Sequence, residues 1–187
     1  ALKLARQVGN RRSEGHQHAG LGGLYEALGR FEDARAEHES ALTIFREIGV
    51  RNSEAWALYS LGSVHLAGGR MHEADSYCAE ALRIARDVGE RRLEGCILHV
   101  VGRIHSAQNR VEEARAAYEA GAVALREVAD AEVLARVLCS RVQLECREGE
   151  AEAAQSAMQE CTALVRDLEV PEESELGKEI AKARDAL

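Results

Sequence analysis

The sequence predicts an all-α protein assembled from helical hairpins, and two observations lead to this fold class. First, hydrophobic residues make up 46% of the 187 residues, too many for a disordered chain, while aromatic residues make up 4% and proline occurs once. Alanine, leucine, glutamate and arginine, which favour helices, dominate. Second, the chain carries an internal repeat of about 40 residues, a unit that buries its apolar face only by stacking on its neighbours.

The repeat runs through the whole sequence without gaps. The four full units are residues 14–53, 54–93, 94–133 and 134–173, of which the last is the most divergent. Residues 1–13 match the ends of the first two units, so we expect them to be the second helix of a truncated repeat that packs on the first full unit. We expect residues 174–187 to form a C-terminal capping helix, and residues 1–187 to form a single solenoid.

Each unit is expected to fold as two helices. In the second unit these are residues 54–68 and about 71–88, and glycines at Gly69 and Gly89 end them, because glycine accepts the left-handed conformation of a helix terminus. Small residues at matching places let the paired helices approach closely. They are Gly22, Gly62 and Gly102 in the first helices, and Ala34, Ala74, Ala114 and Ala154 in the second helices.

The C-terminal segment has the features of a capping helix. Pro171 and the acidic residues Glu172 and Glu173 are a favourable start for a helix. The rest combines a narrow apolar stripe with charged faces, as suits the exposed end of a stack. The stripe consists of Leu176, Ile180, Ala183 and Leu187.

One motif recurs between units and identifies a family resemblance. Its residues are Leu61, Gly62, His65, Gly69, Ala74 and Ala81 in the second unit, and Leu21, Gly22, Tyr25, Gly29, Ala34 and Ala41 in the first. This pattern resembles the tetratricopeptide repeat (TPR) over essentially the whole chain, which implies a right-handed superhelical solenoid of antiparallel hairpins. The usual period is about 34 residues, and the usual proline near the end of the unit is absent. The longer form looks like repeats of multidomain bacterial signalling and regulatory proteins.

The fourth unit departs from the pattern. Arg141 and Glu145 stand where the first two units have leucine and tyrosine or histidine. We expect these two residues to form an i,i+4 ion pair on a less buried edge.

Charge and cysteine content restrict the partners and the compartment. The formal net charge of -8 disfavours nucleic acid. No apolar run is long enough to span a bilayer. Five cysteines without a Cys-x-x-Cys pair indicate a reducing, cytoplasmic setting. Arginine outnumbers lysine, as in proteins from GC-rich bacteria. We therefore expect a cytoplasmic bacterial protein that binds neither nucleic acid nor membrane.

Nothing in the sequence predicts an enzyme, a cofactor or a metal site. No phosphate-loop, zinc-protease, nucleophile-elbow or calcium-loop pattern occurs, and the glycines at 20–23 fall inside a repeat helix. His65 and His105 occupy equivalent places, which indicates rings that fill the helix-pair interface. Cys96 and His99 are three residues apart, but no second pair completes a zinc set.

The resemblance implies a binding surface. In the family, the second, fifth, ninth and twelfth positions of each first helix line the concave face that receives ligands. The residues assigned to that face are Trp56, Tyr59, Ser63, Leu66, His99, Arg103, Ser106, Arg136 and Gln143. The same four positions hold less distinctive side chains in other repeats. These are His16, Ala19, Gly23 and Glu26 in the first repeat, Cys96 in the third, and Cys139 and Cys146 in the fourth.

Within that set, the aromatic and basic residues are the strongest candidates for ligand binding. Trp56 and Tyr59 are suited to be binding hot spots, although Trp56 could instead pack on the preceding unit. Arg103 and Arg136 could hold an acidic ligand group, or could be ordinary exposed arginines. No unit has the lysine and asparagine of a carboxylate clamp at its fifth and ninth positions, which disfavours a receptor for chaperone tails.

These observations predict a protein- or peptide-binding scaffold module within a larger signalling protein. The alternative is a regulatory module that senses a small ligand or signal peptide and controls an attached effector, such as a transcription regulator or a kinase. Self-association through the truncated N-terminal repeat is a third possibility.

Overall fold

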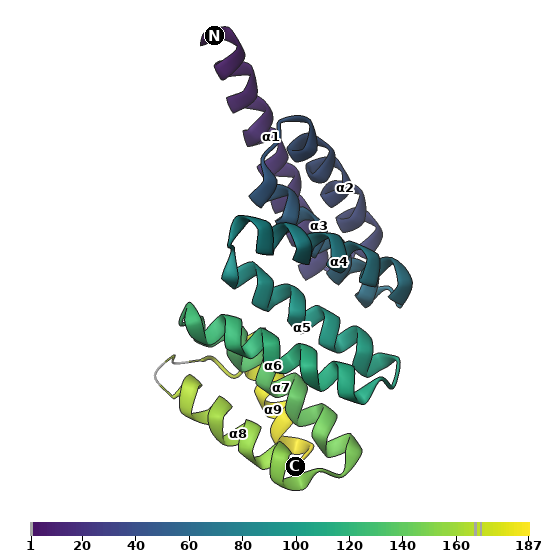
Figure 1. Ribbon diagram of the computed structural model, residues 1–187, viewed down its shortest axis with the longest axis vertical. Coiled ribbons are helices and arrows are strands. Elements are labelled where there is room, and N and C mark those ends of the chain that lie inside the picture. The colour runs from purple at the N-terminus through teal and green to yellow at the C-terminus, as the bar shows by residue number, and fades with distance from the viewer. Residues whose placement is uncertain (1, 167, 169) are drawn as a thin grey trace. The chain divides into compact units, whose positions relative to one another are not determined.

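In a computed structural model, residues 2–166, 168 and 170–187 are described, with side chains from residue 10 onward. These residues form nine helices and no strand, which confirms the all-α prediction (Figure 1). The helices are α1 (Leu2–Ala27), α2 (Phe31–Glu47), α3 (Arg51–Ala67), α4 (Met71–Val88), α5 (Arg91–Ala107), α6 (Val111–Glu127), α7 (Ala131–Glu148), α8 (Ala151–Val165) and α9 (Glu175–Asp185). The chain divides into two compact units, residues 1–93 and 94–187, and each is described by itself.

A left-handed turn recurs at every twentieth residue between α1 and α8. The residues with positive φ are Gly29, Gly49, Gly69, Gly89, Asn109, Ala129 and Gly149, with φ between 54° and 79°. At Gly69 the amide bonds back to the carbonyl of Leu66 at 3.0 Å, and the Arg70 amide bonds to the carbonyl of His65 at 2.9 Å. These bonds satisfy the last carbonyls of the helix and reverse the chain. The forty-residue repeat is therefore two halves of equal length.

The first helices begin earlier than the sequence repeat was divided. Helices α3, α5 and α7 start at Arg51, Arg91 and Ala131, three residues before the boundaries at 54, 94 and 134. The amide of Glu54 already bonds to the carbonyl of Val50 at 2.9 Å, so the helical ladder begins directly after the turn at Gly49. The three residues that appear to end each repeat thus supply the first turn of the next hairpin.

Helix α1 differs from the expected truncated repeat. It continues through Gly9, where the twenty-residue series would place a turn, so the expected second helix of the truncated repeat and the first helix of the next repeat form one helix, Leu2–Ala27. The expected packing of residues 1–8 on the repeat formed by residues 14–53 lies outside the described side chains.

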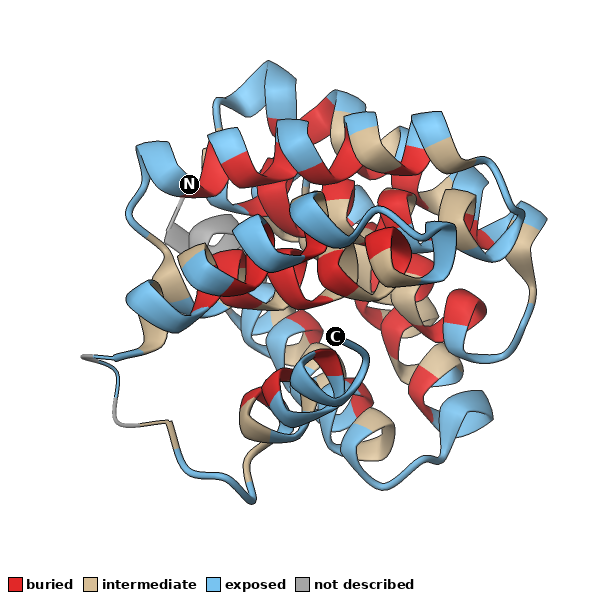
Figure 2. Cartoon of the chain, turned by 90° about the horizontal axis from the view of Figure 1, so that it is seen from below, coloured by how far each residue is buried: buried red, intermediate tan, exposed pale blue. Residues whose placement is uncertain are grey.

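Inside each hairpin, the predicted small residues mark the closest approach of the two helices. A Cβ added at Gly22 would collide with the His38 ring, one at Gly102 with the Tyr118 ring, and one at Gly62 would lie 2.6 Å from the Cys78 sulfur. The four alanines expected opposite them, at positions 34, 74, 114 and 154, are fully buried. Figure 2 shows buried residues on the helix sides that face neighbouring helices and exposed residues on the outer sides.

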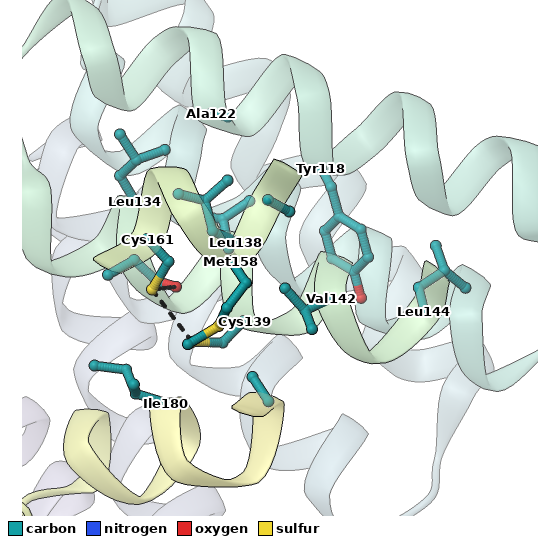
Figure 3. Packing of buried hydrophobic residues seen from close by; sticks show 14 of the residues in the cluster. Tyr118, Ala122, Leu134, Leu138, Cys139, Val142, Leu144, Met158, Cys161 and Ile180 are labelled. Carbon is teal, nitrogen blue, oxygen red and sulfur yellow. Dashed lines mark hydrogen bonds between the residues drawn. The ribbon is translucent and has the colours of Figure 1, made fainter. Parts of the chain in front are cut away.

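The core of residues 94–187 is one apolar cluster to which α6, α7, α8 and α9 all contribute (Figure 3). Helix α9 packs against α7 through Leu176, Ile180 and Ala183, as its apolar stripe predicts, whereas Leu187 is 53% exposed. The helix begins at Glu175 and not at Pro171. Ser174 caps it, since its hydroxyl accepts a 3.0 Å hydrogen bond from the Gly177 amide.

The expectation for Arg141 and Glu145 requires a correction. The two side chains do approach, with Arg141 Nε 3.9 Å from Glu145 Oε1. Glu145, however, is 2% exposed and belongs to the interior, not to an exposed edge. Arg115 on α6 makes this possible, because its guanidinium reaches the carboxylate at 2.6 Å.

Candidate functional site

The face of α3 presents an aromatic pair. The rings of Trp56 and Tyr59 meet edge to face, with centroids 5.7 Å apart and planes at 89°. The Arg92 guanidinium lies 5.7 Å from the centre of the Trp56 ring, within the range of a cation–π contact. Both aromatic side chains are half-buried. This packing fixes the orientation of the rings and leaves part of each accessible to a ligand.

A small pocket opens beside Trp56. Its volume is about 230 Å³, and residues of α1, α2 and α3 form its wall. They are His16, Ala19, Phe45, Ser53, Trp56, Ala57 and Ser60. Since small-molecule sites usually measure about 300–1,000 Å³, this pocket suits a single side chain better than a whole cofactor.

The pocket adds residues to those expected from the sequence. His16 and Ala19 are among the plainer positions assigned to the concave face, and both line it. Ser53 and Ser60 were missed, although they stand three residues before and four after Trp56, the helical spacing that places residues on one face. Phe45 comes from another helix, and no local pattern points to it.

The other two positions expected on α3 differ in exposure. Ser63 is half-buried. Leu66 is 8% exposed, so its side chain belongs to the core and not to an accessible face. The aromatic pair with its pocket is therefore the part of α3 that can meet a ligand; we call it the α3 face and define it by Trp56, Tyr59 and the pocket residues.

Within residues 94–187, side chains of α7 already form hydrogen bonds with two of the residues on α5 that were expected to bind a ligand. His99 Nε2 lies 2.8 Å from the Ser140 hydroxyl. Arg147 donates to the backbone carbonyl of Ser106 at 3.2 Å and lies 3.3 Å from its hydroxyl. Burial, together with the nearby positive charges of Arg103 and Arg136, lowers the pKa of His99 to about 3. His99 is therefore neutral at physiological pH and serves as a structural hydrogen-bonding group.

The expected basic positions of this unit have different surroundings. Arg103 is exposed. Arg136 on α7 binds Glu179 of α9 at 3.1 Å and Glu132 at 3.5 Å. Burial raises the pKa of the Glu179 carboxyl, and Arg136 opposes that rise. The chain's own C-terminal helix thus supplies the acidic group that Arg136 is suited to bind.

Helix α9 also covers the neighbouring positions of α7. Cys139, which the family frame assigns to the concave face, is 1% exposed, and Figure 3 shows it on the side of α7 that faces Ile180. Gln143 is half-buried. Access to the α7 face therefore depends on α9.

Other kinds of site were sought in the described part of the chain. No group of three or more histidine, cysteine, aspartate or glutamate side chains there could hold a metal ion. Among the described helices, none has the length and apolarity needed to cross a membrane.

Comparison with solved structures shows what this fold is similar to. Aspartyl phosphate phosphatase F from Bacillus subtilis matches with a TM-score of 0.80 at 15% identity, over 94% of this chain and 48% of that one. BtubC from P. vanneervenii matches with a TM-score of 0.72 at 16% identity, over 98% of this chain and 84% of that one. A Rap protein complexed with competence and sporulation factor matches with a TM-score of 0.77 at 14% identity, over 96% of this chain and 53% of that one.

The identities in these matches are low, so they establish a shared fold. The chain spans about half the length of the phosphatase and of the Rap protein. A search among curated proteins found no match.

Comparison with protein families gives the assignment. The profile of the MalT-like TPR region matches residues 10–184, nearly the whole chain. The all-α, TPR-like solenoid class expected from the sequence is confirmed by this match and by the solved structures. The chain belongs to the MalT-like TPR region family.

Proposed function

We propose that this chain is a non-catalytic module that binds a peptide or a protein segment, and that its α3 face receives an apolar side chain of that partner. The observation that carries the proposal is the accessible edge-to-face pair of Trp56 and Tyr59 beside a pocket of about 230 Å³. Rigid aromatic rings next to a pocket of side-chain size are typical of the hot spots in protein interfaces.

The lining of the pocket favours a mixed apolar and polar ligand. Phe45, Ala19, Ala57 and the Trp56 ring supply apolar surface, while serine hydroxyls at positions 53 and 60 can bind backbone groups. A peptide offers both kinds of group, since its side chain fills a pocket while its amides form hydrogen bonds. The similarity to a Rap protein that was crystallised with competence and sporulation factor is consistent with a peptide partner.

Trp56 also provides the means to test the proposal, because it is the only tryptophan of the chain. Peptides selected from a random display library against the full chain are synthesised, and their binding is followed through Trp56 fluorescence. Tyr59→Ala should weaken binding at least roughly tenfold, as truncation of a hot-spot aromatic does. Trp56→Ala, measured by calorimetry, should do the same.

A matched control lies away from this face. Arg83 on α4 is exposed and pairs with Asp87, four residues along the same helix, at 3.1 Å, so Arg83→Ala should leave peptide affinity unchanged. If the selected peptides bound Trp56→Ala and Tyr59→Ala as tightly as the unaltered chain, the α3 face would not be the binding site. If only small molecules raised the melting temperature, the ligand-sensing alternative would be favoured.

A further inference from the structure

Two cysteines of the fourth hairpin lie close enough to react with each other. The sulfur of Cys139 on α7 is 3.7 Å from the sulfur of Cys161 on α8. Both residues are buried, at 1% and 0% exposure, within the apolar cluster of Figure 3, where a dashed line joins the two sulfurs. Disulfide formation requires a separation of about 2 Å, so the two sulfurs must approach each other by about 1.7 Å to form the bond.

The repeat explains why the sulfurs meet. Position 161 corresponds to Ala41, Ala81 and Gly121 in the earlier hairpins, all small because the two helices approach closely there. At Gly121 an added Cβ would lie 3.2 Å from the backbone oxygen of Gly95. In the fourth hairpin a thiol occupies this place, and its sulfur lies 3.8 Å from the equivalent carbonyl, that of Ala135.

The two thiols differ from an isolated buried cysteine. Burial, together with the nearby negative charge of Asp75, raises the pKa of the Cys78 thiol on α4 to about 12, which makes it unreactive. In the pair, the hydrogen bond between the two sulfurs lowers the pKa of Cys161 and raises the pKa of Cys139. Cys161 is thus the first of the two to lose its proton, and Cys139 is placed beside it as a thiol.

Helix α9 controls access to the pair. Ile180 of α9 packs on the side of the cluster where the sulfurs lie (Figure 3). Two open pockets flank Cys161 along α8. One, of about 400 Å³, is lined by Met158, one turn before it. The other, of about 540 Å³, is lined by Val165 and Ile180, one turn after it. Neither cysteine lines these pockets, and both are buried, so displacement of α9 is the path by which a small oxidant would reach the sulfurs.

We propose that Cys139 and Cys161 are a redox-modification site, which a peroxide converts into a disulfide between α7 and α8 under the cover of α9. The Cys161 thiolate attacks one peroxide oxygen and becomes a sulfenic acid, while the other oxygen leaves as hydroxide and is protonated to water. The Cys139 sulfur then displaces the sulfenic oxygen as a second water. Two thiols lose two protons and two electrons, and hydrogen peroxide is reduced to two waters.

The sequence allows an unambiguous assay. The full chain is treated with hydrogen peroxide under native conditions, remaining thiols are alkylated, and the protein is digested with trypsin. Arginines at 136, 141, 147 and 166 separate the three nearby cysteines into peptides 137–141, 142–147 and 148–166. The expected product is peptide 137–141 linked to 148–166, with Cys146 alkylated, and dithiothreitol should reverse it. A link that contains Cys146, or oxidation that yields no link, would overturn the proposal.

Variants test the order of events and the role of α9. Cys146→Ser should leave the link intact, whereas Cys139→Ser should abolish it and leave a sulfenic acid on Cys161 that dimedone traps. Ile180→Ala should speed formation of the link at least roughly tenfold, because truncating a buried isoleucine favours displacement of α9. Leu187→Ala, at an exposed position of the C-terminus, should not change the rate. An unchanged rate in Ile180→Ala would show that α9 does not cover the site.

Discussion

Arg115 and Glu145, thirty residues apart, form a two-pronged ion pair that joins α6 to α7. The Arg115 Nε lies 3.1 Å from both carboxylate oxygens, and its terminal nitrogen lies 2.6 Å from Oε2. Glu145 is 2% exposed, so the hydrogen bonds from this guanidinium replace most of those that water would otherwise donate to the carboxylate. The pair links the second helix of one repeat to the first helix of the next.

Arg115→Met should therefore destabilise residues 94–187, because it leaves a buried carboxylate without its main partner. Urea denaturation followed by circular dichroism measures the change. The double variant Arg115→Met with Glu145→Leu should recover most of the loss, since replacing both members of a buried pair is often nearly neutral. Equal losses in the single and double variants would mean that the packing of Arg115, and not its charge, is what stabilises the interface.

Ala129→Gly should stabilise the protein by about 0.5–1 kcal/mol. Ala129 has φ of 54°, a left-handed conformation that costs an alanine about 1–2 kcal/mol and a glycine almost nothing. The greater freedom of glycine in the unfolded chain offsets part of the gain. Thermal denaturation measures it, and the reverse change Gly89→Ala, at φ of 73°, is the matched comparison with an expected loss of similar size.

His99→Gln should reduce the loss of folding stability that residues 94–187 suffer when the pH is lowered. The folded chain holds the pKa of His99 at about 3 through burial and the positive charges of Arg103 and Arg136, whereas the unfolded chain has a value of about 6.5. Below about pH 6.5 the unfolded state binds a proton at His99 that the folded state does not bind, so the free energy of unfolding falls as the pH drops toward 3.

The expected difference can be measured above the range where most carboxylates titrate. Between pH 7 and pH 5 the unaltered chain should lose about 1–2 kcal/mol more than His99→Gln. Urea denaturation at the two pH values gives both numbers. His72→Gln, at an exposed position on α4, is the control and should leave the pH response of residues 94–187 unchanged. Parallel pH profiles for His99→Gln and the unaltered chain would contradict the prediction.

Gly102→Ala should cost about 1–3 kcal/mol, because the new methyl group would collide with the Tyr118 ring and overpack the hairpin. Gly23→Ala is the matched control. Gly23 lies inside α1 with nothing within 4 Å of the added carbon, so alanine should stabilise that helix by about 0.5–1 kcal/mol. Opposite signs for the two substitutions in thermal denaturation are the expected result.

Much of the fold could be predicted because its signals are local. Glycines at 49, 69 and 89 mark turns that need a positive φ, and the matched glycines and alanines mark where paired helices touch. What escaped prediction depends on distant residues. Burial of Glu145 requires Arg115, which stands thirty residues earlier. The packing of α9 on α7 involves the ion pair of Glu179 with Arg136, which is forty-three residues away.

The candidate site was predictable to a similar degree. The family frame placed Trp56 and Tyr59 on one face of a helix, and the structure shows that they touch. It also assigned Leu66 to that face, because a positional rule does not record how a neighbouring helix buries a side chain. Ser53 and Ser60 share the helical face of Trp56, so that periodicity alone was enough to find them.

The even spacing of the left-handed turns limits how this chain can change in length. One residue added inside a helix rotates every later side chain of that helix by about 100°, which carries its apolar stripe toward water. A gain or loss of twenty residues would exchange the roles of the first and second helices, and glycines such as Gly62 would no longer face Cys78 or its equivalents. A gain or loss of forty leaves every helix beside the kind of neighbour that it has now. Whole hairpins are therefore the unit in which such a chain can lengthen or shorten and still fold.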